Sequence, residues 1–424
     1  MRQAISGLRR SLWLATFLTL GLSAASCADE AALEQGADGT SDLVENVTDV
    51  SHTDVRNQSI GNCWSYAATG WLESLHRART GQSVNVSESW ITFWDWHRKI
   101  TGGSSGVTTN ATTMRAEVST GGWWDSAVTI LRDRGVVMED EFIPEEASAA
   151  RSTRQSEALA AINNELNGDG RLASTAARRD PQVVLNVLLD AWRINDDIRA
   201  EIRRVYGLSA RSTLATTAQT PAAWMRKASA FPIRTAVARS STSVPVSWDG
   251  FLTDVIPGGR YAWKSVSYPT TASTRLATQR RVMRALNAAQ PVMVSWLVDF
   301  NARTSGTGAF QIETLRAASG AGRQGGHLVT TEDYEVVVRQ PGQAARTLMA
   351  GQMASAADMR LAEQYGEMVF LRIKNSWGTA QGPLGGTFGG YHDLYTTYLN
   401  GPIRWTEASA DRTPLSSVIV PYGF

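Results

Sequence analysis

The chain has few cysteines and no excess of charge of either sign, and each shortage excludes a class of protein. Only Cys27 and Cys63 occur among the 424 residues, which excludes a disulfide-rich scaffold. Lys and Arg number 41 against 40 Asp and Glu, a formal net charge of +1, so there is no electrostatic basis for binding nucleic acid. No cluster of Cys and His has the spacing of a zinc site, and we expect neither a metal nor another cofactor.

The apolar run near the N-terminus, residues 12–22, is too short to span a bilayer permanently. Three arginines precede it and four small residues follow it, the pattern of an export signal over residues 1–26. Cys27 comes next, as at a bacterial lipoprotein processing site. We therefore expect an exported, lipid-bearing protein of the cell envelope, with ordinary secretion as the alternative. Residues 27–46 are acidic and aperiodic and are expected to form a flexible tether.

Hydrophobic residues make up 43% of the chain, which predicts a sizeable core in one large domain or two ordinary ones. Tryptophan is unusually frequent, with 15 residues. Core packing is the expected role of the tryptophans that cluster in sequence, and a cleft lining is the alternative. These residues are Trp90, Trp94, Trp96, Trp123 and Trp124.

The segment 57–79 carries the strongest functional signal. Its apolar residues recur at helical spacing, which predicts a helix that is buried on one side and begins near Cys63. Unpaired N–H groups at that end favour negative charge, so we expect a lowered pKa for the thiol and a nucleophilic thiolate. A lone cysteine on an apolar helix is more often inert. Gln58, Trp64 and a histidine and asparagine downstream favour a reactive one here.

Two downstream runs supply those partners. Gly-Gly-His-Leu-Val-Thr places His327 at a glycine loop that enters an apolar strand, a context that no other histidine shares. His76 is on the same predicted helix as Cys63, about 20 Å away at a rise of ~1.5 Å per residue, and cannot act as its base. Phe-Leu-Arg-Ile-Lys-Asn-Ser-Trp-Gly is an alternating strand that ends at Asn375.

The residues at 57–58, 61–67, 325–327 and 374–378 resemble the papain-like cysteine peptidases in type and in the chain order Cys, His, Asn. The resemblance implies an α+β, papain-like fold of two lobes. A helical left lobe would carry the cysteine, and an antiparallel, β-barrel-like right lobe would carry the histidine and the asparagine. Residues 47–424 would form this peptidase domain.

The resemblance also implies a role for each matched residue. Cys63 would be the nucleophile and His327 its imidazolium partner. Asn375 would orient the imidazole ring, and Trp377 would cover that hydrogen bond from water. Gln58 would donate to the oxyanion, although it precedes the cysteine by five positions, one fewer than is usual in the family.

Gly121 and Gly122 stand where the family offers its backbone to an extended substrate, and a simple loop is the alternative. We expect Trp123 and Gly326 to add further substrate contacts. The predicted activity is hydrolysis of peptide bonds through a covalent acyl-enzyme. Two alternatives stay open: transfer of the acyl group to an amine, as in a transglutaminase, and peptide binding without catalysis.

The chain departs from the family at several places. Residues 145–207 have helical periodicity and are interpreted as an insertion, either a small subdomain or a lid beside the cleft. Residues 339–366 are interpreted as a smaller insertion between the histidine and asparagine strands. Ile60 stands where many members have a bridged cysteine. The tether is short, so we expect none of the long helical pro-segments common in the family.

Periodic patterns elsewhere predict the remaining elements. Ser87 is expected to cap the helix that contains Trp90. The other predicted helices include 125–134 and 274–289, and the predicted strands are 263–268, 292–298, 394–399 and 418–421.

Overall fold

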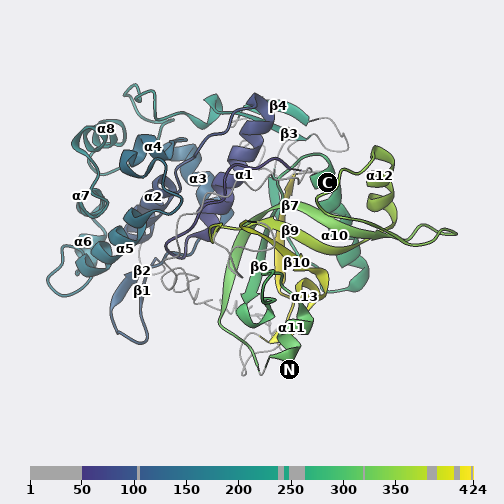
Figure 1. The fold of residues 1–424 in the computed structure, drawn as a ribbon. Helices are drawn as coiled ribbons and strands as arrows, with labels where there is room; N and C mark the ends of the chain where they lie inside the picture. Colours follow the sequence, from purple (N-terminus) through teal and green to yellow (C-terminus); the bar gives the residue numbers. More distant parts are fainter. Residues whose placement is uncertain are drawn as a thin grey trace, which may run out of the picture.

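The computed structural model describes residues 50–102, 106–236, 243–247, 263–318, 320–379, 389–404, 411–421 and 424. The predicted export signal, Cys27 and the tether lie outside these residues. The described chain has a helical half, formed by the earlier part of the sequence, beside a half built on a β-sheet (Figure 1). Helices combined with an antiparallel sheet confirm the predicted α+β class.

The helical half packs against one long helix, α1. Figure 1 shows helices α2 to α8 on the side of α1 away from the sheet. A short hairpin, β1–β2, projects from this half. The elements are α1 (Cys63–Thr80), α2 (Glu88–Thr101), β1 (Val107–Thr109), β2 (Ala116–Val118), α3 (Trp124–Arg134), α4 (Glu139–Phe142), α5 (Thr153–Glu165), α6 (Thr175–Arg178), α7 (Pro181–Ala191) and α8 (Asp196–Tyr206).

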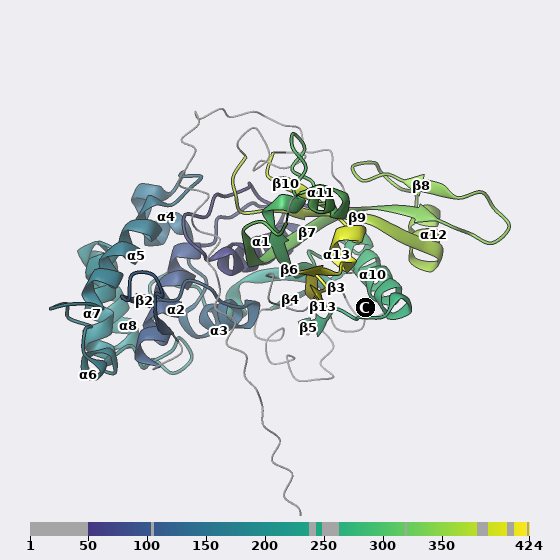
Figure 2. The ribbon, with the colours of Figure 1, turned by 90° about the horizontal axis from the view of Figure 1, so that it is seen from below.

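The other half is a sheet in the order β10-β9-β7-β6-β13-β5, in which β8 also pairs with β7 and all neighbours are antiparallel. Strand β8 and helix α12 extend from one end of it (Figure 2). The strands are β5 (Trp263–Ser267), β6 (Met293–Asp299), β7 (Gln324–Val338), β8 (Arg346–Leu348), β9 (Gly366–Lys374), β10 (Tyr391–Tyr395) and β13 (Leu415–Pro421), and the helices are α10 (Ala272–Asn287), α11 (Ile312–Ala317), α12 (Ala356–Tyr365) and α13 (Thr396–Asn400).

Helix α1 lies at the junction of the two halves. All its residues from Cys63 to His76 are buried, because neighbouring elements cover it on several sides. On the sheet side, the Thr330 hydroxyl of β7 donates to the Ala67 carbonyl at 3.0 Å. The helix ends at Gly81, whose φ of 73° is a left-handed conformation that favours glycine. The first residue of α1 is therefore placed where the halves meet.

A further hairpin covers the C-terminal part of α1. Strands β3 (Pro232–Ala236) and β4 (Ser243–Ser247) form it. The His76 ring stacks on Phe231 with centroids 4.5 Å apart, and its Nδ1 lies 2.8 Å from the Pro232 carbonyl oxygen. His76 thus packs against this hairpin.

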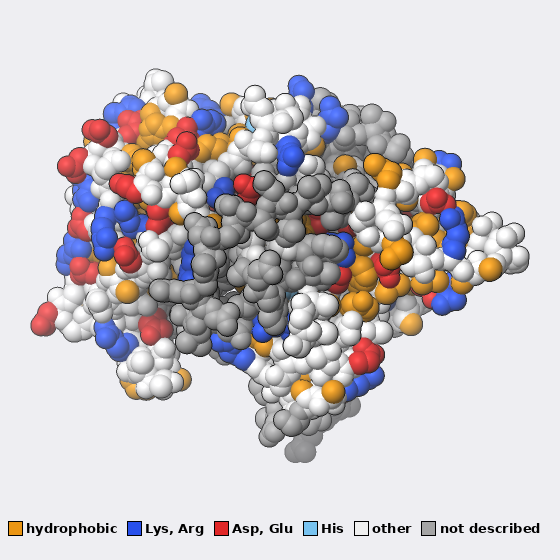
Figure 3. Space-filling view, in the orientation of Figure 1, with side chains coloured by type: hydrophobic (Ala, Val, Ile, Leu, Met, Phe, Trp, Pro, Cys, Tyr) orange, Lys and Arg blue, Asp and Glu red, His pale blue; other side chains and the backbone are white. Residues whose placement is uncertain are grey.

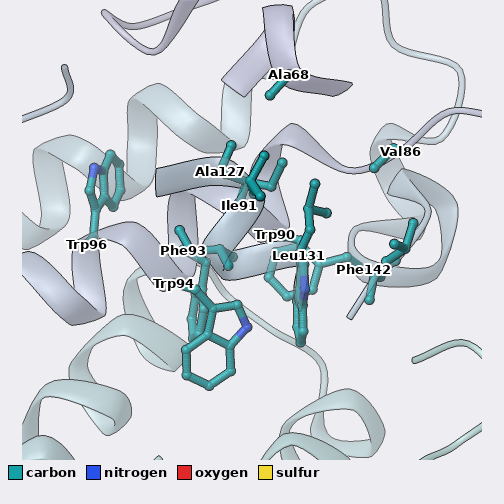
Figure 4. Close-up of a cluster of buried hydrophobic side chains, with 14 of the residues drawn as sticks. Ala68, Val86, Trp90, Ile91, Phe93, Trp94, Trp96, Ala127, Leu131 and Phe142 are labelled. Carbon is teal, nitrogen blue, oxygen red and sulfur yellow. The ribbon is translucent and has the colours of Figure 1, made fainter. Parts of the chain in front are cut away.

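The core of the helical half is rich in aromatic rings. Trp90, Phe93 and Trp94 of α2 pack among Leu131 of α3 and Phe142 of α4 (Figure 4). The centroids of Trp90 and Phe142 are 5.1 Å apart, and the two rings meet edge to face. Such contacts contribute about 0.5–1.5 kcal/mol per pair beyond the burial of area.

Core packing is confirmed for four of the five clustered tryptophans. Trp90, Trp94, Trp96 and Trp124 are all buried. Trp123 is 65% exposed, so the core interpretation is wrong for it. It precedes α3 in extended conformation, which turns its side chain away from the core that receives Trp124.

Several local predictions are confirmed. The Ser87 hydroxyl caps α2 by accepting from the Trp90 N–H at 2.8 Å. The predicted segments 274–289 and 292–298 correspond to α10 and β6. The strand predicted at 394–399 is confirmed up to Tyr395, where β10 ends. It is wrong beyond that residue, because α13 begins at Thr396.

Charged side chains of both signs are mixed over the helical half (Figure 3), in keeping with the near-zero net charge. Hydrophobic side chains are more frequent near the far end of the sheet half in the same view. Among the described residues, no helix has the length and apolar content needed to cross a bilayer.

Candidate active site

The pairing of β7 with β9 brings His327 and Asn375 together. His327 lies near the start of β7, and Asn375 directly follows β9. The His327 Nε2 is 2.7 Å from the Asn375 Oδ1, which also accepts from the Ser376 backbone N–H at 2.8 Å. Because an amide oxygen only accepts, this contact requires the proton on Nε2 and leaves Nδ1 as an acceptor. Within the described residues, Nδ1 has no hydrogen-bond partner.

Aromatic rings enclose the histidine. The Trp377 ring stacks on His327 with centroids 4.9 Å apart and planes 23° apart. Trp296, its register partner on β6, approaches edge-on at 6.1 Å. His327 is only 2% exposed. This burial lowers the pKa of His327 to about 4, against the opposing effect of the hydrogen bond to Asn375.

Cys63 reaches the same place from the helical half. It is the first residue of α1 and is 7% exposed. Its thiol hydrogen-bonds with the backbone of Leu328, the residue after His327. The structure therefore places the sulfur against the strand that carries the histidine.

The sequence-based prediction of a lowered pKa for Cys63 is wrong for this structure. The expected backbone donors are present, since Leu328, Trp64 and Cys63 itself hydrogen-bond the sulfur and lower its pKa. Burial has the larger effect and raises the pKa of the thiol to about 11. At neutral pH the thiol of Cys63 and the imidazole of His327 are therefore both uncharged.

Gln58 is held by hydrogen bonds to Ser376 and Ile60. The Ser376 hydroxyl donates to its Oε1 at 2.6 Å, and the Gln58 backbone N–H donates to the Ser376 carbonyl at 2.8 Å. The amide Nε2 donates to the Ile60 carbonyl at 2.9 Å. That nitrogen carries a second hydrogen, for which the described residues provide no acceptor.

Gly121 and Gly122 pass beside the residue that follows the cysteine. The Trp64 indole N–H donates to the Thr120 carbonyl at 2.9 Å, and Gly122 packs on the Trp64 ring so closely that a Cβ would overlap it. Within the described residues, the Gly122 backbone N–H and C=O make no hydrogen bond. The exposed Trp123 comes next. The backbone groups of Gly122 and the exposed indole of Trp123 are therefore adjacent in this loop.

Gly326 precedes the histidine and is exposed. A Cβ built at Gly326 would meet no atom of the described residues within 4 Å. The sequence analysis did not predict that Trp296 contacts His327 or that Leu328 contacts Cys63. Neither residue belongs to a recognisable motif, and strand pairing places Trp296 beside His327.

A small cavity adjoins the site at Leu328 and Asn375, and neither Cys63 nor His327 lines it. Its wall includes Glu73, Glu88 and Lys374. Burial, with the nearby carboxylates of Glu73 and Glu139, raises the pKa of Glu88 to about 8. We do not assign this cavity to a substrate. Among the described residues, no group of His, Cys, Asp and Glu side chains has an arrangement that could hold a metal ion.

Comparison with known proteins gives structural likenesses only. No protein-family model and no curated protein matches the chain. A digestive procathepsin L 3 from Tenebrio molitor larval midgut is 16% identical with a TM-score of 0.32, over 88% of this chain and 67% of that one. Bromelain protease from Ananas comosus, in complex with the E64 inhibitor, is 13% identical with a TM-score of 0.31, over 87% and 93%. A cysteine protease from Carica candamarcensis, also bound to E-64, is 13% identical with a TM-score of 0.30, over 87% and 92%. TM-scores this low support no conclusion about the activity of this chain.

Proposed function

We propose that the chain is a papain-like cysteine peptidase that hydrolyses peptide bonds. One observation carries the proposal. Asn375 holds His327 so that Nδ1 is an unpartnered acceptor, and the next residue on the same strand touches the thiol of Cys63. A nucleophile, a base and a group that orients the base are the parts that acyl transfer requires.

The first step forms the acyl-enzyme. As the substrate carbonyl approaches, the His327 Nδ1 accepts the proton of the Cys63 thiol, the sulfur bonds to the carbonyl carbon, and the C=O electron pair moves onto oxygen. The free hydrogen of the Gln58 amide and the Cys63 backbone N–H would stabilise that oxyanion. The imidazolium then donates its proton to the leaving amine as the C–N bond breaks.

Water completes the reaction. His327 takes a proton from a water molecule, whose oxygen adds to the acyl carbon, and the carboxylic acid leaves as the S–C bond breaks and the thiol regains its proton. Asn375 keeps the proton of Nε2 in place through both steps. Trp377 excludes water from that hydrogen bond, which strengthens it.

The substrate would be a polypeptide in extended form. We propose that its backbone pairs with the free groups of Gly122, beside Gly121, and that Trp123 and Gly326 border the bound peptide. We also propose that the protein is exported to the bacterial cell envelope, with Cys27 as the lipid attachment site.

Thiol alkylation tests the proposed function. The protein is treated with an epoxide-type thiol reagent, which forms an S–C bond as the epoxide opens, and is then mapped by peptide mass spectrometry. We expect modification at Cys63, with a loss of peptide turnover in proportion to it. Turnover that survives complete modification of Cys63 would refute the proposal. A labelled amine in the same assay separates hydrolysis from acyl transfer, because only the transferase incorporates it.

A further inference from the structure

Lys99 of α2 reaches the loop that carries the glycine pair. We call residues 119–123 the glycine loop. The Lys99 ammonium donates to the Ser119 carbonyl at 2.8 Å and to the Gly121 carbonyl, and it pairs with Asp95 at 2.6 Å. It also lies 5.8 Å from the centre of the Trp64 ring. The ammonium therefore donates two hydrogen bonds to carbonyls of the glycine loop and forms an ion pair with Asp95.

The Lys99 ammonium lies in a largely buried environment. The Lys99 side chain is 14% exposed, and the Asp95 carboxylate beside it is fully buried. Burying a lysine costs free energy unless the charge is paired and its donors are used. Arg98, the preceding residue, pairs with the other oxygen of the same carboxylate at 2.9 Å but is 50% exposed and, among the described residues, forms no hydrogen bond with the glycine loop. Because the Lys99 ammonium is largely buried and donates to two backbone carbonyls, it stabilises the conformation of the glycine loop.

Lys99 and Trp64 together turn three consecutive carbonyls of the glycine loop inward. Lys99 donates to the carbonyls of Ser119 and Gly121, and the Trp64 indole N–H donates to that of Thr120. Gly122 is the next residue, and its carbonyl is the one in the glycine loop that accepts no hydrogen bond from the described residues. Cys63 is a free cysteine, and no disulfide in the described part of the chain fixes the loop. The Lys99 ammonium links α2 to the glycine loop without a covalent bond.

We propose that Lys99 is a positioning residue for peptide binding, which clamps the glycine loop so that Gly122 faces an extended substrate. The identity of the ligand rests on the proposed function. Lys99 itself touches neither the peptide nor the reacting atoms. Its effect should therefore appear with ligands that extend along the loop and should be absent with a ligand that reaches only the thiol.

Two reagents that modify Cys63 separate these cases. Iodoacetamide needs only the sulfur, whereas a peptidyl epoxide must also bind along the glycine loop. For Lys99→Met, which keeps an apolar stem against Trp64, we expect the rate of modification by the peptidyl epoxide to fall about 10-fold or more, since small misplacements are costly. The rate with iodoacetamide should stay within about twofold of the wild-type rate. Lys99→Arg, which keeps the charge and several donors, should restore most of the loss.

Arg98→Met is the matched control, because it removes a charge from the same carboxylate without touching the loop, and both rates should stay unchanged. If Lys99→Met does not fold, Lys99→Gln replaces it, with the same expectation. Equal losses with both reagents, an unchanged peptidyl rate, or unfolding of both variants would overturn the assignment. If the wild-type protein shows no preference for the peptidyl reagent, the proposed function fails as well. If it shows the preference and Lys99→Met keeps it, only the clamp is refuted.

Discussion

The imidazole Nε2 of His327 and the side-chain oxygen of Asn375 lie 2.7 Å apart, because His327 is on β7 and Asn375 directly follows β9, which pairs antiparallel with β7. The same oxygen accepts from the Ser376 N–H, so the amide cannot rotate without losing two hydrogen bonds. This contact determines which ring nitrogen is protonated, and hence that Nδ1 is the basic one.

Asn375→Ala should therefore lower kcat by about 10- to 100-fold and leave KM nearly unchanged, because the ring loses its fixed tautomer and orientation. Steady-state kinetics on a peptide substrate measures both constants. A thermal unfolding midpoint close to that of the wild type would show that the loss is not one of folding. Unchanged kcat would contradict the role of this contact.

The pH dependence of kcat/KM should follow the histidine. Burial lowers the pKa of His327 to about 4, and below that pH the ring holds a proton on Nδ1 and cannot accept one from the thiol. Activity should thus fall as the pH drops through about 4. Trp377→Ala opens the ring to water, which removes part of the burial effect and raises the pKa toward its ordinary 6.5.

The acid limb of the Trp377→Ala profile should consequently lie at higher pH than that of the wild type. Trp377→Phe, which keeps an aromatic ring over the histidine, should shift it less. A limb that stays in place, or that moves to lower pH, would show that the indole does not control the solvation of His327.

Gln58→Ala should reduce kcat by about 10²-fold, the usual cost of losing one oxyanion donor. The neighbouring Ser59 offers a matched control, since its buried hydroxyl has no hydrogen-bond partner in the described residues. Ser59→Ala should leave kcat close to the wild-type value. If both variants behave alike, the Gln58 amide is not an oxyanion donor.

Asn167, which follows α5, should prove necessary for an ordered β1–β2 hairpin. Its side chain accepts from the Ala116 N–H and donates to the Ala116 carbonyl, both at 2.8 Å, and so pairs with the free edge of β2. Asn167→Ala should cost about 1–2 kcal/mol of unfolding free energy and speed hydrogen exchange in residues 107–118.

Asn164 gives the control for that change, because among the described residues its side chain bonds only the exposed side chain of Arg115. Asn164→Ala should alter hydrogen exchange in the hairpin little. Equal protection in the Asn167→Ala and wild-type proteins would mean that the β1–β2 pairing alone is sufficient.

Local patterns predicted much of the fold because they depend on neighbours in sequence. The buried helix that starts at Cys63 and the cap at Ser87 are examples, since periodicity and one side-chain oxygen determine them. Cys63, His327 and Asn375 were selected by resemblance to a family, not by periodicity. The structure places His327 against Asn375, and Cys63 against Leu328, the neighbour of His327.

Other features depend on tertiary packing and could not be predicted locally. The pKa of Cys63 has the opposite shift to that expected, because desolvation by burial outweighs the backbone hydrogen bonds that lower it. Trp123 is exposed although its neighbour Trp124 is buried. Lys99 looked like one of many charged helix residues, and only the fold shows that its ammonium meets carbonyls some twenty residues away.

The most direct test of the central claim compares wild-type protein with Cys63→Ala on an unstructured protein substrate, with the thermal unfolding midpoint of each. The account predicts turnover by the wild type, none by the variant, and nearly equal midpoints. Turnover retained by Cys63→Ala would contradict it.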